Sequence, residues 1–144
     1  SASASARPGP GKGCHVPVAL EGNTLVYHFR SPVESGDLWM CDGAADGAAV
    51  RVTHTFPPAV RAKLSAPQEL VVGGRHALLY RPPPSPGPQP AIVWAHGGPM
   101  AAFSYEYSPI ASWLASLGYF VCVPNFAGSV GFGVALMDEV LGDG

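Results

Sequence analysis

The feature that most constrains this chain is a short apolar run that ends in a glycine turn. Residues 91–95 are all apolar, Pro90 precedes them, and residues 96–99 read His-Gly-Gly-Pro. An apolar run of this length between turn signals predicts a strand buried on both faces of a sheet. We expect Gly97 and Gly98 to adopt backbone angles that a side chain would resist. The loop would then present backbone N–H groups at the carboxyl end of the strand.

A helix and a second apolar strand follow this loop. The helix is indicated by apolar side chains at helical spacing, namely Ile110, Trp113, Leu114 and Leu117. Pro109 suits its first position and Gly118 suits its end. Residues 119–123 are again apolar, so strand, helix and strand predict a βαβ unit with two parallel strands. A Gly-rich loop at 124–133 and the beginning of another helix at 134–141 follow.

The chain before Pro90 alternates with period two instead. Residues 24–30 place Leu25, Tyr27 and Phe29 on one side, which is typical of a half-buried strand. Further strands at 37–41 and 49–54, joined by turns rich in Gly and Asp, complete an antiparallel meander. A sheet this small is marginally stable and needs neighbours, as a propeller blade does.

A hairpin and a proline-rich segment join the two parts. Residues 69–72 and 76–80 flank Gly73-Gly74-Arg75, a strong hairpin signal. Residues 81–90 are mostly proline, so they lack the backbone donors of a helix or a central strand and predict a stiff exposed connection. A ligand for a proline-binding domain is the alternative reading of this segment. The organisation is therefore expected to change at Pro90, antiparallel before it and parallel after it.

Composition excludes several classes of function. The 144 residues are 47% hydrophobic and 12% charged, which suits a packed core, and a net charge of −2 argues against nucleic acid as a partner. The three cysteines are far apart, so neither a zinc site nor a disulfide framework is expected. No apolar run is long enough to cross a membrane, and we expect no membrane partner, no cofactor and a cytoplasmic location. The histidines are scattered, and Glu106 with Asp138 is a weak candidate carboxylate pair.

Three stretches together resemble the prolyl oligopeptidase family of serine peptidases, in particular its acylaminoacyl-peptidase and dipeptidyl-peptidase branches. They are Trp-Ala-His-Gly-Gly-Pro at 94–99, Leu-Gly-Tyr at 117–119, and Asn-Phe-Ala-Gly-Ser-Val-Gly-Phe-Gly at 125–133. The likeness is good over residues 76–137 and looser over 23–75. It implies an α/β fold, the start of an α/β-hydrolase parallel sheet preceded by an antiparallel meander resembling a propeller blade.

The resemblance also implies a domain plan and a truncated chain. Residues 1–14 would be a flexible lead-in, 15–63 the last propeller blade, 64–90 the hairpin and connection, and 91–144 the first part of the catalytic domain. The remainder of the hydrolase domain and of the propeller would be missing. The full-length parent would hydrolyse short peptides, and this chain would contribute only its oxyanion loop.

The site residues follow from the same resemblance. The backbone N–H of Gly97 would donate to the oxyanion of the tetrahedral intermediate, with His96 and Gly98 shaping the loop. A side chain at Gly97 or Gly98 would crowd the approaching carbonyl. Ala127 stands where the family usually has Arg, which puts the rigidity of that loop in doubt.

The catalytic triad is not expected within this chain. No Gly-x-Ser-x-Gly elbow occurs, and the nearest approximation centres on Ser129. Two residues separate Ser129 from the preceding strand, and no histidine follows it, so the required chain order is not met. We expect Ser129 to be a loop serine and the chain as given to be inactive.

Two other functions remain open at this point. A carboxylesterase or lipase could use the same loop, although such enzymes generally show a third glycine where Pro99 stands and have no propeller upstream. A non-catalytic β-rich interaction module is the alternative from another class, and Ala127 favours it. The residues beyond Gly144 would separate the three, because a serine elbow followed by Asp and His defines an enzyme.

Overall fold

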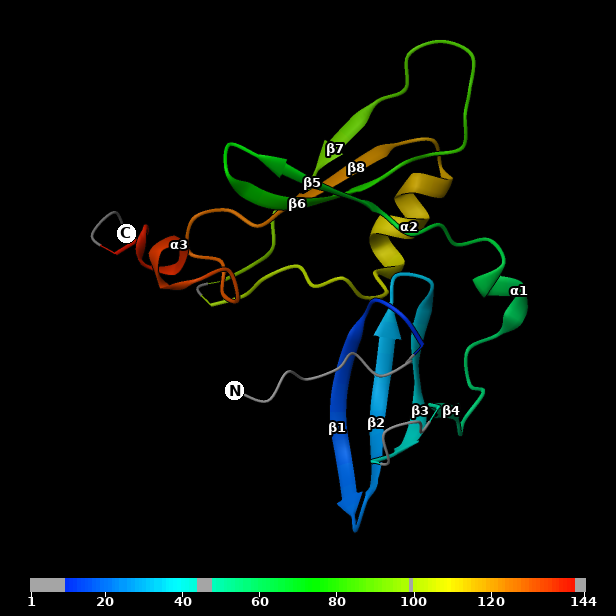
Figure 1. Ribbon diagram of the computed structural model, residues 1–144. Coiled ribbons are helices and arrows are strands. Elements are labelled where there is room, and N and C mark those ends of the chain that lie inside the picture. Colours follow the sequence, from blue (N-terminus) through cyan, green and yellow to red (C-terminus); the bar gives the residue numbers. More distant parts are fainter. Residues whose placement is uncertain (1–9, 44–47, 99, 142–144) are drawn as a thin grey trace. The chain divides into compact units, whose positions relative to one another are not determined.

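The computed structural model describes residues 10–43, 48–98 and 100–141 of the chain. The chain divides into two units, Ser1–Leu64 with Tyr105–Tyr107, and Ser65–Ser104 with Ser108–Gly144. Each unit contains one four-stranded sheet (Figure 1). The first nine residues of the expected lead-in, and Pro99 of the glycine turn, lie outside the described residues.

The first unit is an antiparallel meander, as the sequence predicts. Its strands follow in chain order, β1 (Cys14–Glu21), β2 (Thr24–Ser31), β3 (Glu34–Asp42) and β4 (Val50–Arg51). Strand β1 lies before the first strand predicted from the sequence, and it contains Pro17, a residue that argues against a central strand. The structure accommodates Pro17 because β1 is an edge strand, with an irregular register between Pro17 and Ala19.

The core of this meander lies on the predicted side of β2. Tyr27 and Phe29 are buried together with Cys41 of β3. Leu25, Trp39 and Ala49 pack against them, and the Phe29 and Trp39 rings meet edge to face at 6.0 Å. The period-two pattern at 24–30 is thereby confirmed.

A buried aspartate fixes the end of the meander. Asp37 accepts hydrogen bonds from the Thr53 hydroxyl at 2.6 Å and the Thr55 amide at 2.9 Å, and it pairs with the Arg51 guanidinium. Burial by itself raises the pKa of Asp37, but these hydrogen bonds, from Thr53 first, outweigh it and hold the pKa well below its usual range. Strand β4 is shorter than the strand expected at 49–54, because beyond it the Val52 and Thr53 amides both donate to the Leu38 carbonyl and the Leu38 amide donates to the Thr53 hydroxyl.

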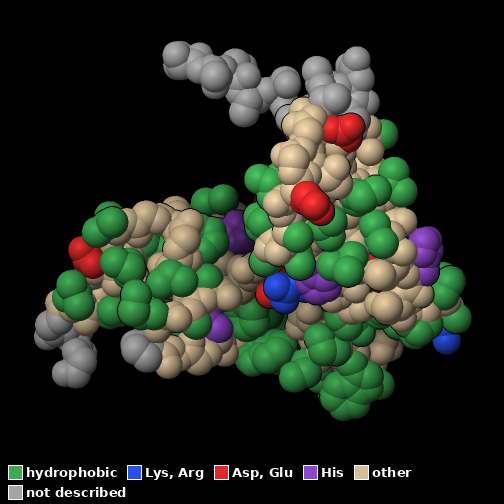
Figure 2. All heavy atoms as spheres, turned by 90° about the horizontal axis from the view of Figure 1, so that it is seen from below, with side chains coloured by type: hydrophobic (Ala, Val, Ile, Leu, Met, Phe, Trp, Pro, Cys, Tyr) green, Lys and Arg blue, Asp and Glu red, His purple; other side chains and the backbone are tan. Residues whose placement is uncertain are grey.

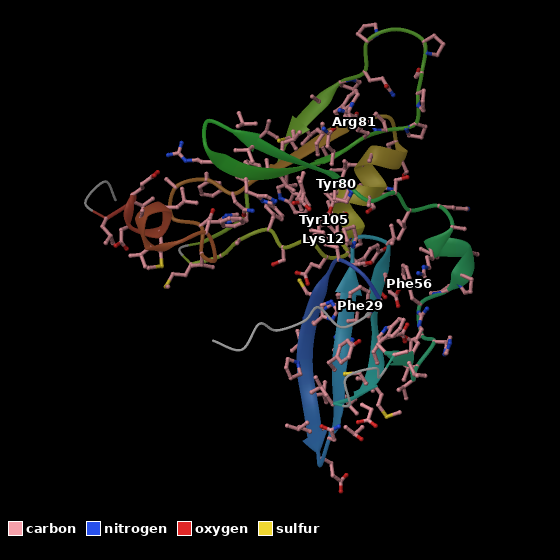
Figure 3. All side chains as sticks on the ribbon, viewed as in Figure 1. Lys12, Phe29, Phe56, Tyr80, Arg81 and Tyr105 are labelled. Atoms are coloured by element: carbon pink, nitrogen blue, oxygen red, sulfur yellow. The ribbon has the colours of Figure 1, made fainter. Side chains whose placement is uncertain are left out.

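Residues Tyr105–Tyr107 belong to this first unit. Lys12 lies over the Tyr105 ring at 4.8 Å (Figure 3), and Tyr107 meets Phe56 at 5.2 Å between ring centroids. Glu106 pairs with Arg30 at 3.3 Å. Glu106 therefore has a structural ion-pair partner, which accounts for its charge without the carboxylate pairing with Asp138 considered from the sequence.

The second unit contains a mixed sheet in the order β5-β6-β8-β7. Strands β5 (Gln68–Val72) and β6 (Arg75–Tyr80) form the predicted hairpin, and its turn glycines Gly73 and Gly74 have φ of +57° and +78°. Strands β7 (Ala91–Val93) and β8 (Phe120–Pro124) pair in parallel, with Ile92 opposite Val121. The predicted parallel pair is confirmed.

This sheet departs from the sequence predictions in two respects. The strands before Pro90 pair antiparallel with one another and the β7–β8 pair after it is parallel, as predicted, but β6 also pairs antiparallel with β8, so the hairpin belongs to the second sheet. Strand β7 is at the sheet edge, and Val93 is 73% exposed instead of buried on both faces. The apolar pattern of β7 indicates a covered strand, but within the described residues no strand pairs with its outer edge.

Helix α2 (Pro109–Ser116) begins and ends where the sequence predicts. The Ser108 hydroxyl caps it by accepting from the Ala111 amide, and Gly118 follows it with φ of +99°. It buries Ala111 and Ala115, however, and not the predicted stripe. Ile110, Trp113 and Leu117 are 50%, 60% and 55% exposed. Figure 2 shows hydrophobic side chains over much of one face of the molecule. The other helices, α1 (Pro58–Arg61) and α3 (Val134–Asp138), are short.

The proline-rich segment folds back on itself. The Gln89 side chain donates to the Pro83 carbonyl at 3.0 Å, Gly87 turns the chain with φ of +85°, and Pro82 is buried. A ligand for a proline-binding domain must be extended. The observed loop matches the predicted connection and not the ligand.

Candidate functional site

The candidate oxyanion loop leaves the sheet at the carboxyl end of β7. The Trp94 amide still donates to the Cys122 carbonyl at 2.9 Å, and the chain then runs without regular structure through residues 95–98. Gly97 and Gly98 are exposed. Within residues 10–43, 48–98 and 100–141, no group accepts a hydrogen bond from the Gly97 amide. This amide is thus available to an oxygen from outside.

The two glycines do not have the backbone role that was expected of them. Neither has a positive φ, unlike Gly73, Gly74 and Gly128. A Cβ added at Gly97 would meet nothing within 4 Å, and one at Gly98 would only touch the Met100 amide at 4.0 Å. The turn itself therefore tolerates a side chain, and the requirement for glycine must come from a group that approaches the loop.

His96 holds this loop through both ring nitrogens. Its Nδ1 lies 2.7 Å from the Gly97 carbonyl and its Nε2 lies 2.8 Å from Ser129 Oγ. Because a carbonyl only accepts, Nδ1 carries the proton, and Nε2 of the neutral ring accepts the Ser129 hydroxyl proton. The ring also stacks on Phe126 at 4.3 Å between centroids. The position of His96 agrees with the loop-shaping role assigned to it.

Ser129 bonds a histidine as an activated serine does, but a substrate cannot reach its hydroxyl. It is 0% exposed, and its amide donates to the Phe126 carbonyl at 3.0 Å within a tight turn. A nucleophile must meet a carbonyl carbon at near van der Waals distance, which a fully buried hydroxyl cannot do. The hydrogen bond from Ser129 to His96 is therefore structural.

Asn125 and His76 are the residues that sequence reasoning missed. Asn125 is fully buried directly after β8, and its carboxamide bonds both the amide and the carbonyl of Phe103. Its second amide proton points to Nδ1 of His76 at 3.0 Å. The available signal was a lone amide side chain immediately after an all-apolar strand, where a buried polar group needs partners.

The loop that contains Ala127 is anchored although no arginine stands at that position. The Val130 amide donates to the Ala101 carbonyl at 3.1 Å, and the Gly128 amide donates to the Leu136 carbonyl at 2.8 Å. The Ser129 hydroxyl adds the bond to His96. These contacts hold the 125–131 loop against the oxyanion loop, so the substitution at Ala127 does not leave it unattached.

Other kinds of site find no support in the part of the chain that the structure describes. No group of His, Cys, Asp and Glu side chains there has the arrangement of a metal site. No disulfide joins Cys14, Cys41 and Cys122. None of the helices in the described ranges is long and apolar enough to span a membrane.

The known proteins that this chain resembles are peptidases. No protein-family model matches the chain. Dipeptidyl peptidase family member 6 of Caenorhabditis elegans is 46% identical over 56 residues, which is 39% of this chain and 8% of that protein. Dipeptidyl aminopeptidase BIII of Pseudoxanthomonas mexicana is 50% identical over 46 residues, 32% of this chain and 7% of that protein.

Solved structures extend the likeness to most of the chain. A puromycin-hydrolyzing peptidase of Mycobacterium tuberculosis superposes with a TM-score of 0.70 at 25% identity, over 83% of this chain and 20% of that chain. The resemblance to the prolyl oligopeptidase family of serine peptidases is thereby confirmed. The chain spans less than a tenth of these curated relatives and about a fifth of this solved chain.

Proposed function

We propose that this chain supplies the oxyanion-binding loop of a serine-type peptidase that hydrolyses short peptides. The observation that carries the proposal is the exposed Gly97 amide, which no described residue engages, on a loop held rigid by His96. A preformed donor of this kind stabilises the negative charge of the tetrahedral intermediate by about 3 kcal/mol. The glycines then keep the approach of the substrate carbonyl open.

The remaining machinery would lie in a longer polypeptide. No serine elbow occurs in the sequence, and no histidine follows His96. The nucleophile, its acid and its base are therefore assigned to residues beyond Gly144, and the chain as given is proposed to be inactive. The exposed outer edge of β7 supports this, because Val93 is a β-branched residue that suits a covered strand.

We further propose that the first unit is a propeller blade and the second the opening of an α/β-hydrolase sheet. Four antiparallel strands in simple chain order are the form that a blade takes. Val16, Val18 and Leu20 of β1 are 43%, 60% and 71% exposed. An apolar edge strand of this kind suits packing against a neighbouring sheet.

The test replaces the Gly97 amide alone. In the full polypeptide, exchanging Gly97 for glycolate by semisynthesis turns the N–H into an ester oxygen without adding a side chain. We expect kcat for dipeptidyl and acylaminoacyl 4-nitroanilides to fall 10²–10³-fold with KM little changed. The same replacement at Gly74, in the β5–β6 turn, is the control.

Three results would overturn the proposal. Unchanged kcat in the glycolate variant at position 97 would remove the Gly97 amide from the reaction. Turnover of 4-nitrophenyl esters without turnover of either anilide would favour a carboxylesterase. No turnover of any of these substrates, in a folded full polypeptide, would favour a non-catalytic module.

A further inference from the structure

We propose that Asn125, supported by His76, is the positioning residue of the oxyanion loop, an inference that rests on the function proposed above. The side-chain hydrogen bonds of Asn125 go to Phe103 and His76 and not to Gly97. It acts through Phe103, the residue at the end of the 94–103 segment, whose backbone it bonds next to β8.

The backbone of Asn125 is fixed by the sheet. Its amide donates to the His76 carbonyl at 2.8 Å, one residue beyond the last β6–β8 pair, Ala77 with Pro124. The side chain is completely buried. Strand β8 therefore fixes the position of the carboxamide, and burial prevents it from turning toward solvent.

The carboxamide makes the two backbone hydrogen bonds to Phe103 that a neighbouring strand would otherwise make. Its Oδ1 accepts from the Phe103 amide at 2.8 Å, and its Nδ2 donates to the Phe103 carbonyl at 3.0 Å. A side chain that bonds both backbone groups of one residue permits a single register. Phe103 can neither slide along the chain direction nor rotate its peptide planes without losing both bonds.

His76 fixes which way the carboxamide faces. Since Oδ1 must face the Phe103 amide, both protons of Nδ2 are donated, one to the Phe103 carbonyl and one to His76 Nδ1 at 3.0 Å. His76 Nδ1 is thus the acceptor, and its ring is held by stacking on Phe132 at 5.1 Å. All the polar atoms of the Asn125 carboxamide have partners.

Phe103 passes this restraint to the oxyanion loop. Its ring lies edge-on to Trp94 at 5.4 Å and to His96 at 5.5 Å between centroids. His96 therefore contacts both Phe103 and Phe126, and its Nδ1–H bonds the Gly97 carbonyl. A shift of Phe103 would move the His96 ring that packs against it, and because His96 bonds the Gly97 carbonyl, the direction of the Gly97 amide would change.

The experiment uses the full polypeptide with Asn125→Asp and Asn125→Leu. Asn125→Asp keeps the shape and the acceptor for the Phe103 amide but removes both donors, whereas Asn125→Leu removes all the bonds. We expect kcat for an acylaminoacyl 4-nitroanilide to fall about 10- to 100-fold with KM changed less than threefold, because a small misplacement of a catalytic group affects the transition state most.

Two further measurements separate positioning from stability. Gly74→Ala, in the β5–β6 turn, is the matched control, since it strains the same sheet without touching the loop. His76→Phe keeps the ring stacked on Phe132 but removes the Nδ1 acceptor, and it should lower kcat in the same direction as Asn125→Asp. Amide hydrogen exchange over residues 94–104 should accelerate at least tenfold in the Asn125 variants and not in Gly74→Ala.

The outcomes distinguish this inference from the proposed function. Unchanged kcat, or unchanged exchange over 94–104, in folded Asn125→Asp would overturn the positioning role, even where glycolate at position 97 abolishes activity. Conversely, accelerated exchange in Asn125→Asp together with full activity of the glycolate variant would show that Asn125 restrains residues 94–104. It would also show that the Gly97 amide does not bind the oxyanion. If Asn125→Leu does not fold, Asn125→Asp decides.

Discussion

The Ser129 hydroxyl donates to Nε2 of His96 at 2.8 Å, and the opposite ring nitrogen of His96 bonds the carbonyl of Gly97. A serine bonded to a neutral imidazole whose other nitrogen is oriented by an acceptor is the hydrogen-bond pattern of a catalytic triad. Here the pattern joins two loops of the second unit, and the serine is fully buried. The hydrogen-bond arrangement that activates a nucleophile at an exposed site here holds the buried Ser129 loop to the His96 loop.

Ser129→Ala tests this structural assignment. The substitution leaves Nε2 of His96 without its donor, so we expect the free energy of unfolding to fall by about 1–3 kcal/mol. Denaturant unfolding followed by tryptophan fluorescence measures the loss. Ser116→Ala, which removes an exposed hydroxyl bond to the Trp113 carbonyl, is the control and should change stability by less than about 0.5 kcal/mol.

The same assignment predicts that Ser129 is chemically inert. A fluorophosphonate probe should not label the chain at Ser129, because the hydroxyl has no solvent exposure. Mass spectrometry of the digested protein locates any adduct. Labelling of Ser129 in the folded chain would contradict its structural role.

The glycines are expected to divide into two groups on substitution. Gly97→Ala should leave the melting temperature unchanged, because its φ is not positive and a Cβ there has open space. Gly128→Ala should destabilise by about 1–2 kcal/mol or more, since its φ is +90° and the new Cβ would lie 3.1 Å from Val140 Cγ1. Calorimetry of the two variants side by side makes the comparison, and equal losses would contradict it.

A structural feature could be predicted from the sequence where the residues that form it are close together along the chain. The hairpin at Gly73-Gly74 and the start of α2 at Pro109 follow from neighbouring residues, and the parallel pairing of β7 with β8 follows from the order strand, helix, strand; all three are confirmed. The pairing of β6 with β8 could not be predicted, because it joins segments more than 40 residues apart, Ala77 with Pro124.

The candidate site was predictable only in part for the same reason. The exposed glycine loop is visible in the sequence, but the bonds of Asn125 to Phe103 and of Ser129 to His96 bridge residues distant along the chain. The expected burial of β7 and of the α2 stripe fails for a different reason. A pattern of apolar residues predicts that a face is covered, and it does not say which residues cover it.

The first unit should lose stability in acid through Asp37. Its pKa is lowered in the folded state, first by the Thr53 hydroxyl and then by Arg51 and Thr55, which together outweigh the desolvation that raises it. A lowered folded-state pKa gives stability that is present above the unfolded value of about 3.9 and lost as the pH falls toward the folded value. We therefore expect a constant unfolding midpoint above about pH 5 and a progressive decrease below about pH 4.

Asp37→Asn is the variant that checks the origin of this dependence. It removes one of the two carboxylates that pair with Arg51, which keeps Glu34 at 3.1 Å, and it weakens the hydrogen bonds that Asp37 accepts, so the first unit should be destabilised at neutral pH by about 1–3 kcal/mol. The decrease between pH 4 and pH 2 should become shallower in the variant. Urea unfolding at a series of pH values measures both, and an unaltered acid slope would show that other carboxylates cause it.

The exposed stripe of α2 is expected to govern self-association of the chain. Ile110, Trp113 and Leu117 present a continuous apolar face, and such a face promotes aggregation when nothing covers it. Trp113→Glu should lower the sedimentation-derived association constant at least tenfold without reducing the melting temperature, because the Trp113 side chain is 60% exposed. Ala115→Glu, on the buried face of the same helix, places an unpaired charge in the interior and should unfold the second unit. Sedimentation velocity over a range of concentrations distinguishes the two effects, and a Trp113→Glu variant that associates as before would mean that another surface joins the copies.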